Sequence, residues 1–250
     1  MEGTSSVLFA REGTQDRLLQ GATAYLDALD ADADLLYADL HATKHADKFV
    51  LIEMYRDGAA RKRQSAAAHG RSWASLCGNL LRPDSVMERI RPLLSAPPAM
   101  ARPVDDGGCD PRAPLRCAIG IGCQPCGAFV RVFPKPDCEQ EFIPILHAQG
   151  ERVAEHEPGF VYADFYRLDA PGCWLVVEYY DDRSSLSHHH TLPQTLKFAD
   201  HKAGAGYESR KHEAFTPTHR LGGPVGTDVC GGSGVVATQA SRALVRRAKC

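Results

Sequence analysis

An internal repeat is the feature that most limits the folds open to this chain. Segment 32–57 aligns without a gap with segment 157–182, at an offset of 125 residues, which is half of the 250-residue chain. The residues that are identical at this offset include the pairs Tyr37 and Tyr162, Asp39 and Asp164, Glu53 and Glu178, Tyr55 and Tyr180, and Asp57 and Asp182. Because a repeated sequence predicts a repeated structural unit, we interpret the chain as two diverged copies of one domain.

The repeat predicts two domains with a linker between them. We expect the first domain at residues 1–94 and the second at residues 128–220. The linker, residues 95–127, is rich in Pro, Gly and Cys, and residues 221–250 have the Gly-rich composition typical of a flexible tail. A chain of this length accommodates two domains of ordinary size.

Each copy has the periodicities of a ferredoxin-like unit. Alternation with period two predicts strands, and apolar residues at helical spacing predict helices. For the first copy the expected elements are strand 6–11, helix 15–29 capped by Thr14, strands 35–41 and 48–55, helix 59–77 capped by Asp57, and strand 86–91. For the second copy they are strand 129–133, helix 138–156, strands 160–168 and 174–180, helix 184–201 and strand 211–216. The predicted fold is therefore α+β, with the order β-α-β-β-α-β occurring twice.

Composition excludes several classes of partner. The net charge of −2 offers no electrostatic case for binding nucleic acid or an anionic membrane. No apolar run approaches the ~20 residues that a membrane helix needs. The first residues lack the basic and apolar regions of a secretory signal, and an odd number of cysteines, nine, argues against a disulfide framework. We therefore expect a cytoplasmic protein with reduced thiols.

The second copy resembles the antibiotic biosynthesis monooxygenase (ABM) domain family. The resemblance lies in the acidic-Pro-Gly turn 157–159, the strand that ends at Glu178, and a helix that carries His189 eleven residues later. The family often has a second histidine about five residues further on, and the first copy has His69 at that position. Each copy keeps one of the two histidines, since Gln64 and Gln194 occupy the other two positions. The resemblance covers about residues 1–92 and 128–217.

The resemblance implies both an assembly and a chemistry. Members of the family pair two sheets face to face in a dimeric α+β barrel, so here we expect an intramolecular pseudo-dimer, with further self-association left open. Members oxygenate quinols, anthrones or similar aromatics, some of them without metal or flavin. We therefore expect a cofactor-independent monooxygenase whose partners are a small aromatic substrate and O₂. A deprotonated phenol or anthrone is electron-rich enough to reduce O₂, and histidine suits the role of proton acceptor.

The candidate site residues follow from the resemblance. We expect His189 and His69 to be the catalytic bases of their copies. The expected substrate-binding residues are Tyr162, Tyr37, Tyr180, Trp73 and Phe198. The structural alternative for each is packing, since tyrosine suits a half-buried sheet and histidine suits a helix surface. For Glu53 and Glu178 the sequence favours a helix-capping or interface role.

Two alternatives to this function stay open at this point. A non-catalytic barrel that binds a small molecule, or that has a structural role, has the same fold. Haem-degrading members of the family use an Asn on strand one together with a Trp and a His on helix two. The first copy has Trp73 and His69 on that helix, but segments 6–11 and 129–133 lack the Asn. No metal site is expected, because Cys123 and Cys126 have zinc-like spacing without a second paired motif. The run 188–190 of three histidines points in different directions on a helix and does not form one ligand set either.

Overall fold

The computed structural model describes residues 1–29, 32–93, 100–101, 126–135, 138–195 and 207–222. The chain divides into two compact units, unit 1 (Met1–Arg91 and Thr216–Cys250) and unit 2 (Pro92–Phe215). Most of the predicted linker and the tail beyond residue 222 lie outside the described residues.

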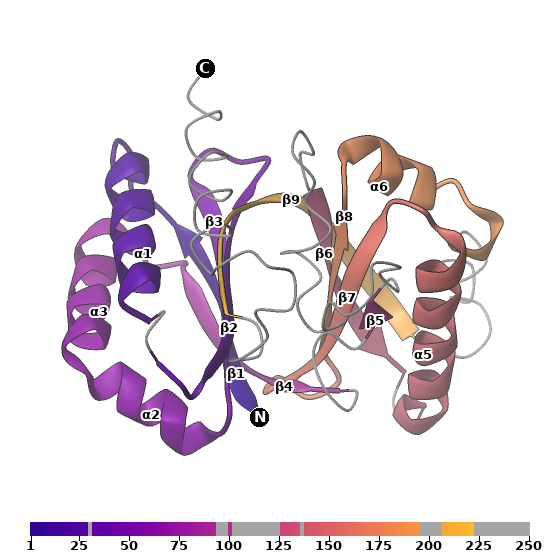
Figure 1. The fold of residues 1–250 in the computed structure, drawn as a ribbon, viewed down its shortest axis with the longest axis horizontal. Coiled ribbons are helices and arrows are strands. Elements are labelled where there is room, and N and C mark those ends of the chain that lie inside the picture. Colours follow the sequence, from indigo (N-terminus) through magenta and orange to yellow (C-terminus); the bar gives the residue numbers. More distant parts are fainter. Residues whose placement is uncertain (30–31, 94–99, 102–125, 136–137, 196–206, 223–250) are drawn as a thin grey trace, which may run out of the picture. The chain divides into compact units, whose positions relative to one another are not determined.

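Unit 1 is an antiparallel sheet with helices on one face (Figure 1). Its elements in chain order are β1 (Glu2–Phe9), α1 (Gln15–Leu29), β2 (Leu35–Thr43), β3 (Lys48–Tyr55), α2 (Gly58–Ala66), α3 (Ala68–Leu80) and β4 (Val86–Pro92). The strand order is β4-β1-β3-β2. The predicted second helix is divided at Ala67, whose extended backbone ends α2 and precedes α3.

Unit 2 repeats this arrangement. Its elements are β5 (Met100–Ala101), β6 (Cys126–Pro134), α5 (Glu139–His156), β7 (Phe160–Leu168), β8 (Trp174–Tyr180), α6 (Arg183–His189) and β9 (Tyr207–Gly222). The strand order is β9-β6-β8-β7-β5, and α5 and α6 lie on one face of the sheet (Figure 1). The predicted β-α-β-β-α-β order is therefore confirmed in both units, and the α+β ferredoxin-like class with it.

The core of each unit lies between its sheet and its first helix. In unit 1, Leu18, Leu26 and Leu29 of α1 are buried in one cluster with Ala38 and Leu40 of β2. Side chains of a strand alternate between the two faces of a sheet. Tyr37, Asp39 and His41, which are also buried, therefore lie on the face opposite the helices.

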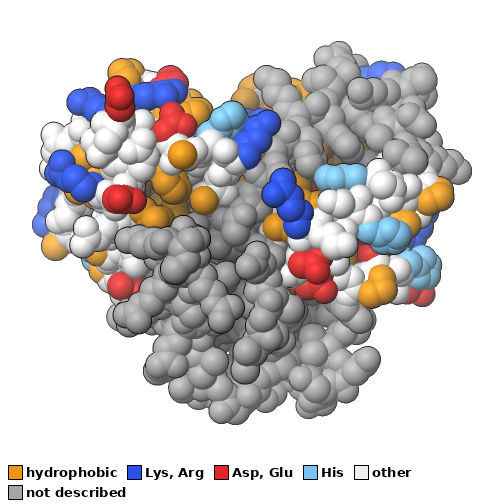
Figure 2. Space-filling view, turned by 90° about the horizontal axis from the view of Figure 1, so that it is seen from above, with side chains coloured by type: hydrophobic (Ala, Val, Ile, Leu, Met, Phe, Trp, Pro, Cys, Tyr) orange, Lys and Arg blue, Asp and Glu red, His pale blue; other side chains and the backbone are white. Residues whose placement is uncertain are grey.

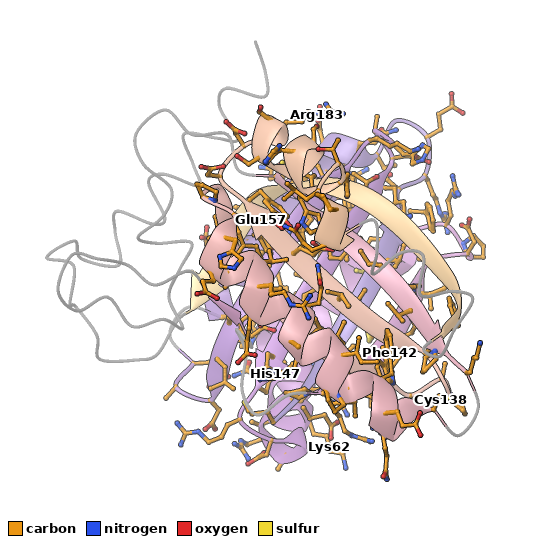
Figure 3. The ribbon with its side chains drawn as sticks, turned by 90° about the vertical axis from the view of Figure 1, so that its right-hand side faces the viewer. Lys62, Cys138, Phe142, His147, Glu157 and Arg183 are labelled. Atoms are coloured by element: carbon orange, nitrogen blue, oxygen red, sulfur yellow. The ribbon has the colours of Figure 1, made fainter. Side chains whose placement is uncertain are left out.

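The core of unit 2 has the same construction. Phe142 and Leu146 of α5 are buried with Val176 of β8 and Trp174. The rings of Phe142 and Trp174 lie 5.5 Å apart, and Figure 3 shows Phe142 beside the helix α5, which lies in front of the sheet in this view. This packing places α5 over the centre of the sheet, where the cavity described below is found.

Aspartates cap the helices that follow β3 and β8. The carboxylate of Asp57 accepts a hydrogen bond from the backbone N–H of Ala60 at 2.8 Å, as predicted. Asp182 accepts one from Ser185 at the same distance. The capping role that the sequence favoured for Glu53 and Glu178 is thus wrong, because the aspartates four residues later perform it. The predicted cap Thr14 differs as well, since its hydroxyl donates to the carbonyls of Arg11 and Leu80.

The described surface is polar and mixed in charge. In Figure 2, acidic, basic and histidine side chains are interspersed with hydrophobic ones on the face in view. Among the described helices, none is both long enough and apolar enough to cross a bilayer.

Candidate functional site

A cavity of about 60 Å³ lies between α5 and the sheet of unit 2. Its walls are mostly apolar and include Val130, Leu146, Phe165 and Val176. The polar side chains that line it are Gln149, Glu178, His189 and Thr195. An apolar cavity with a few convergent polar groups is the usual form of a small-molecule site.

His189 is held between two carboxylates. Its Nδ1 lies 2.8 Å from Oε2 of Glu157, and its Nε2 lies 3.5 Å from Oε2 of Glu178. Both His189 and Glu157 are buried, with 6% and 4% of their surface exposed. Because the partner of one ring nitrogen fixes the orientation and the proton position of the other, Glu157 orients the imidazole so that Nε2 faces Glu178.

Polar neighbours complete this arrangement around Glu157. Gln194 donates from Nε2 to Oε1 of Glu157 at 3.4 Å, and the hydroxyl of Thr195 lies 3.4 Å from Nδ1 of His189. Figure 3 shows Glu157 just beyond the end of α5, beneath the helix that begins with Arg183. A buried carboxylate is tolerated when it is hydrogen-bonded in this way.

Glu178 receives a second partner from its own strand. The hydroxyl of Tyr180 donates to Oε2 of Glu178 at 3.1 Å. Burial raises the pKa of Tyr180 well above its ordinary value, and the negative charge of Glu178 raises it further. Tyr180 therefore stays a protonated phenol that supports the carboxylate. Its ring lies 5.3 Å from that of His189, so Tyr180 packs behind the two side chains, Glu178 and His189, that line the cavity.

The corresponding carboxylate of unit 1 has a different environment. Oε1 of Glu53 accepts hydrogen bonds from the hydroxyls of Tyr25 and Tyr55, at 2.7 and 2.8 Å, and Oε2 accepts one from Thr4 at 3.0 Å. Burial and the adjacent charge of Glu53 raise the pKa of both tyrosines, so they remain donors. Burial, with a contribution from Glu53, also raises the pKa of the nearby Cys77 to about 12.

The remaining candidates of unit 1 pack around Tyr25. The ring of Trp73 stacks on Tyr25 with centroids 5.3 Å apart and an interplanar angle of 9°. His69 contacts Gln64 through Nε2, and its ring lies 6.1 Å from that of Tyr25. Trp73 and His69, the two residues that the haem alternative would use, are thus engaged with other side chains.

The structure therefore brings together only some of the predicted site residues. His189 lines the cavity, and Tyr180 supports Glu178. Tyr37 lies on the sheet face opposite the helices. The side chain of Tyr162, and Phe198 as a whole, lie outside the described residues.

Two site residues escaped the sequence analysis as functional groups. Glu157 was noted only as the acidic residue of a turn, and Glu178 only as the end of a strand. Glu157 and Glu178 contact His189 but precede it in the sequence by 32 and 11 residues, and no local pattern encodes contacts over such separations. The sequence signal that could have identified Glu178 is its spacing from Tyr180, because residues two apart in a strand lie on the same face, here of β8.

Comparison with known families matches the site-bearing part of the chain. The sequence model of the family "Antibiotic biosynthesis monooxygenase" matches residues 126–201, which include the cavity, Glu157 and His189. It matches this one segment, so the interpretation of unit 1 as a second ABM copy stays a prediction. The search of curated proteins found no match.

Solved structures share the fold across nearly the whole chain. A candidate monooxygenase from Fusobacterium nucleatum has a TM-score of 0.71 at 10% identity, covering 88% of this chain and 94% of that one. One from Lactobacillus acidophilus has a TM-score of 0.68 at 14% identity, with coverages of 88% and 95%. A structure described as an anthrone oxidase-like protein has a TM-score of 0.61 at 12% identity, with coverages of 88% and 92%. Such identities establish likeness of fold, and the family match identifies residues 126–201 as an ABM domain.

Proposed function

We propose that this protein is an ABM-type monooxygenase that uses O₂ to oxygenate a quinol-like or anthrone-like small aromatic, without a cofactor. The observation that supports it best is the placement of His189 and Glu178 together at the lining of an apolar cavity within the matched domain. The cavity offers an aromatic ring an apolar environment, and the pair offers an acceptor for its proton. General bases of this kind act on protons within hydrogen-bond reach.

The reaction balances without a further reductant. Removal of a proton from the substrate leaves a carbanion or phenolate, which transfers one electron to O₂. Recombination of the two radicals forms a C–O bond and a peroxide, and loss of water then leaves a carbonyl. For an anthrone-type carbon the sum is R₂CH₂ + O₂ → R₂C=O + H₂O, and for a single-ring quinol oxygenated to a hydroxyquinone it is C₆H₆O₂ + O₂ → C₆H₄O₃ + H₂O. The role of His189 and Glu178 is to hold the proton that leaves carbon or oxygen and to return it to the departing water.

The proposal assigns catalysis to unit 2 and a supporting role to unit 1. Unit 1 would be a diverged ABM copy whose carboxylate, Glu53, is occupied by protein hydroxyls. We propose further that the two units pair within one chain as a dimeric α+β barrel, with domain boundaries near residues 94 and 128. A ferredoxin-like unit has one uncovered sheet face, and a second unit buries it.

Oxygen uptake by metal-stripped protein, measured against a panel of hydroquinones and anthrones, tests the proposal. We expect His189→Ala to lose at least ~100-fold in rate, because positioned general bases contribute about that much or more. The matched control is His188→Ala, which removes an exposed histidine of the same helix and should leave the rate unchanged.

Two outcomes would contradict the proposal. Uptake that His189→Ala leaves unaltered would remove this residue as the base. No uptake with any substrate of the panel, together with measurable binding of the same compounds, would favour the rival function of a non-catalytic binding domain.

A further inference from the structure

In unit 1 the central carboxylate, Glu53, has a phenol as a partner. Tyr25 brings a phenol hydroxyl from α1 to Oε1 of Glu53 at 2.7 Å, with its ring between the helix and the sheet. This is the same region, between the first helix and the sheet, in which unit 2 has its cavity. The two units can therefore be compared position by position.

The strand register and the buried helix positions fix the correspondence. Thr4 pairs with Glu53 across β1 and β3, and Ala128 pairs with Glu178 across β6 and β8, so Thr4 corresponds to Ala128. That offset is 124 residues. The buried residues Leu18, Ala22 and Leu29 of α1 and Phe142, Leu146 and Val153 of α5 differ by the same offset. Tyr25 therefore corresponds to Gln149, which lines the cavity.

Unit 2 lacks both of the hydroxyls that come to Glu53 from other elements. Ala128 has no hydroxyl where Thr4 has one, and Gln149 has no phenol where Tyr25 has one. The third donor is kept, since Tyr180 donates to Glu178 as Tyr55 donates to Glu53. Glu178 thus lies at the cavity wall in a position where its counterpart binds a phenol.

The cavity is small. Its volume of about 60 Å³ is less than the ~150 Å³ of an apolar protein cavity that holds benzene, so a single-ring ligand fits only when side chains of the wall, such as Gln149, move aside. Val130, Leu146, Phe165 and Val176 supply apolar walls for such a ring. A three-ring anthrone is too large for this volume.

We infer that the cavity of unit 2 binds a single-ring phenol or quinol whose hydroxyl donates to Glu178, in the place that Tyr25 occupies in unit 1. This inference rests on the proposed function and specifies its substrate class. A hydrogen bond from a phenol to a carboxylate is charge-assisted and stronger than a neutral one. This hydrogen bond places the acidic proton of the substrate next to Glu178, whose carboxylate in turn faces Nε2 of His189.

Binding measured without turnover tests the inference, with 4-methylphenol and toluene as probes that differ in one hydroxyl. Isothermal titration of the full chain should show 4-methylphenol binding at least ~10-fold more tightly than toluene, since hydrogen bonds to charged groups discriminate by that order. Glu178→Leu should remove the preference and keep the binding of toluene. Equal affinities in the unaltered protein would overturn the inference.

A variant that copies unit 1 gives the second test. Gln149→Tyr should fill the cavity with the protein's own phenol and abolish binding of 4-methylphenol, whereas Gln140→Tyr, an exposed change on the same helix, should not. Conversely, Tyr25→Ala should open a second site, so that the stoichiometry of 4-methylphenol rises from one to two. Unchanged binding in Gln149→Tyr, or unchanged stoichiometry in a folded Tyr25→Ala, would contradict the correspondence.

These outcomes separate the site from the reaction. Preference for 4-methylphenol without any oxygen uptake supports the phenol site and refutes the monooxygenase. Oxygen uptake that depends on His189, without any preference for the phenol, supports the monooxygenase and refutes the phenol site.

Discussion

Glu53 and Glu178 occupy the same position of the repeat and have different partners. Glu53 accepts three hydroxyl hydrogen bonds within a packed core, whereas Glu178 lies at a cavity beside Tyr180 and His189. A buried carboxylate needs such partners, because an unsatisfied charged group is costly inside a protein. One carboxylate is therefore fully occupied by protein hydroxyls, and the other lines a cavity.

Tyr25→Phe should lower the free energy of unfolding by about 1–3 kcal/mol. The change removes a donor from the buried Glu53 and leaves the volume of the core nearly unchanged. Urea denaturation followed by circular dichroism measures it. Thr23→Ala is the control, because it deletes a hydroxyl of the same helix that bonds the carbonyl of Leu19 within that helix. We expect the control to change stability by less than about 0.5 kcal/mol, and equal losses in both variants would contradict the role of Tyr25.

At the scale of elements, the junction between α2 and α3 depends on a close backbone approach. A Cβ added at Gly70 would lie 2.2 Å from the carbonyl oxygen of Gln64, which is backbone and cannot move aside easily. That carbonyl also accepts the hydrogen bond of the Ala67 N–H at the end of α2. The division of the helix therefore requires glycine at position 70.

Two glycine substitutions in α3 should have opposite effects. Gly70→Ala should destabilise the protein by about 1–3 kcal/mol, because the methyl group meets backbone atoms. Gly78→Ala should stabilise it by about 0.5–1 kcal/mol, since its methyl group meets open space and alanine favours helix. Thermal unfolding of the two variants checks the contrast, and a Gly70→Ala variant at least as stable as the parent would show that a side chain does not strain the approach at Gly70.

The N-terminal cap of α2 should make stability depend on pH in the acidic range. The hydrogen bond from Ala60 lowers the pKa of Asp57 below its ordinary value of 3.8. A lowered folded-state pKa means that the contribution of the carboxylate is present above that value and is lost as pH falls through the folded-state pKa. Asp57→Asn keeps a capping oxygen without the titration, so its midpoint of urea unfolding should fall less than that of the parent below pH 4. Parallel pH profiles would contradict this assignment.

At the scale of the whole molecule, the two units have the same element order and separate cores. Unit 1 packs around Leu26 and Trp73, and unit 2 packs around Phe142 and Trp174. The difference between them lies in what occupies the space between the first helix and the sheet. A tyrosine fills it in unit 1, and a cavity remains in unit 2.

Matched substitutions of the two carboxylates should separate stability from activity. Glu53→Gln should cost about 1–3 kcal/mol of unfolding free energy, because three hydroxyls lose a charged acceptor. Below its melting temperature this variant should keep the parent's oxygen uptake. Glu178→Gln should have the smaller effect on stability and the larger effect on uptake. Denaturation and oxygen-electrode measurements on both proteins check this, and a fall in uptake for Glu53→Gln alone would reverse the assignment of the active unit.

Local patterns predicted the order of the elements and several boundaries, but the predicted helix 184–201 was too long, because α6 ends at His189. The boundaries of α1, β3, β7 and β8 match the expected ranges, because periods of 2.0 and 3.6 residues are written directly into the order of apolar and polar residues. The division of the second helix at Ala67 was not expected, since it depends on the contact of Gly70 with a preceding turn. The site was predicted in part: the spacing pointed to His189, and its partners Glu157 and Glu178 emerged only from the structure.

The sequence by itself determined that two β-α-β-β-α-β units follow one another and that each ends a central strand with Glu, Tyr and Asp at fixed spacing. Only the tertiary structure decided which unit has an accessible carboxylate. The difference depends on whether a side chain of the first helix, Tyr25 or Gln149, reaches the middle of the sheet. Such a contact joins residues 28 positions apart across a packed interface. Its formation depends on the shape and volume of all the neighbouring side chains, which no local pattern specifies.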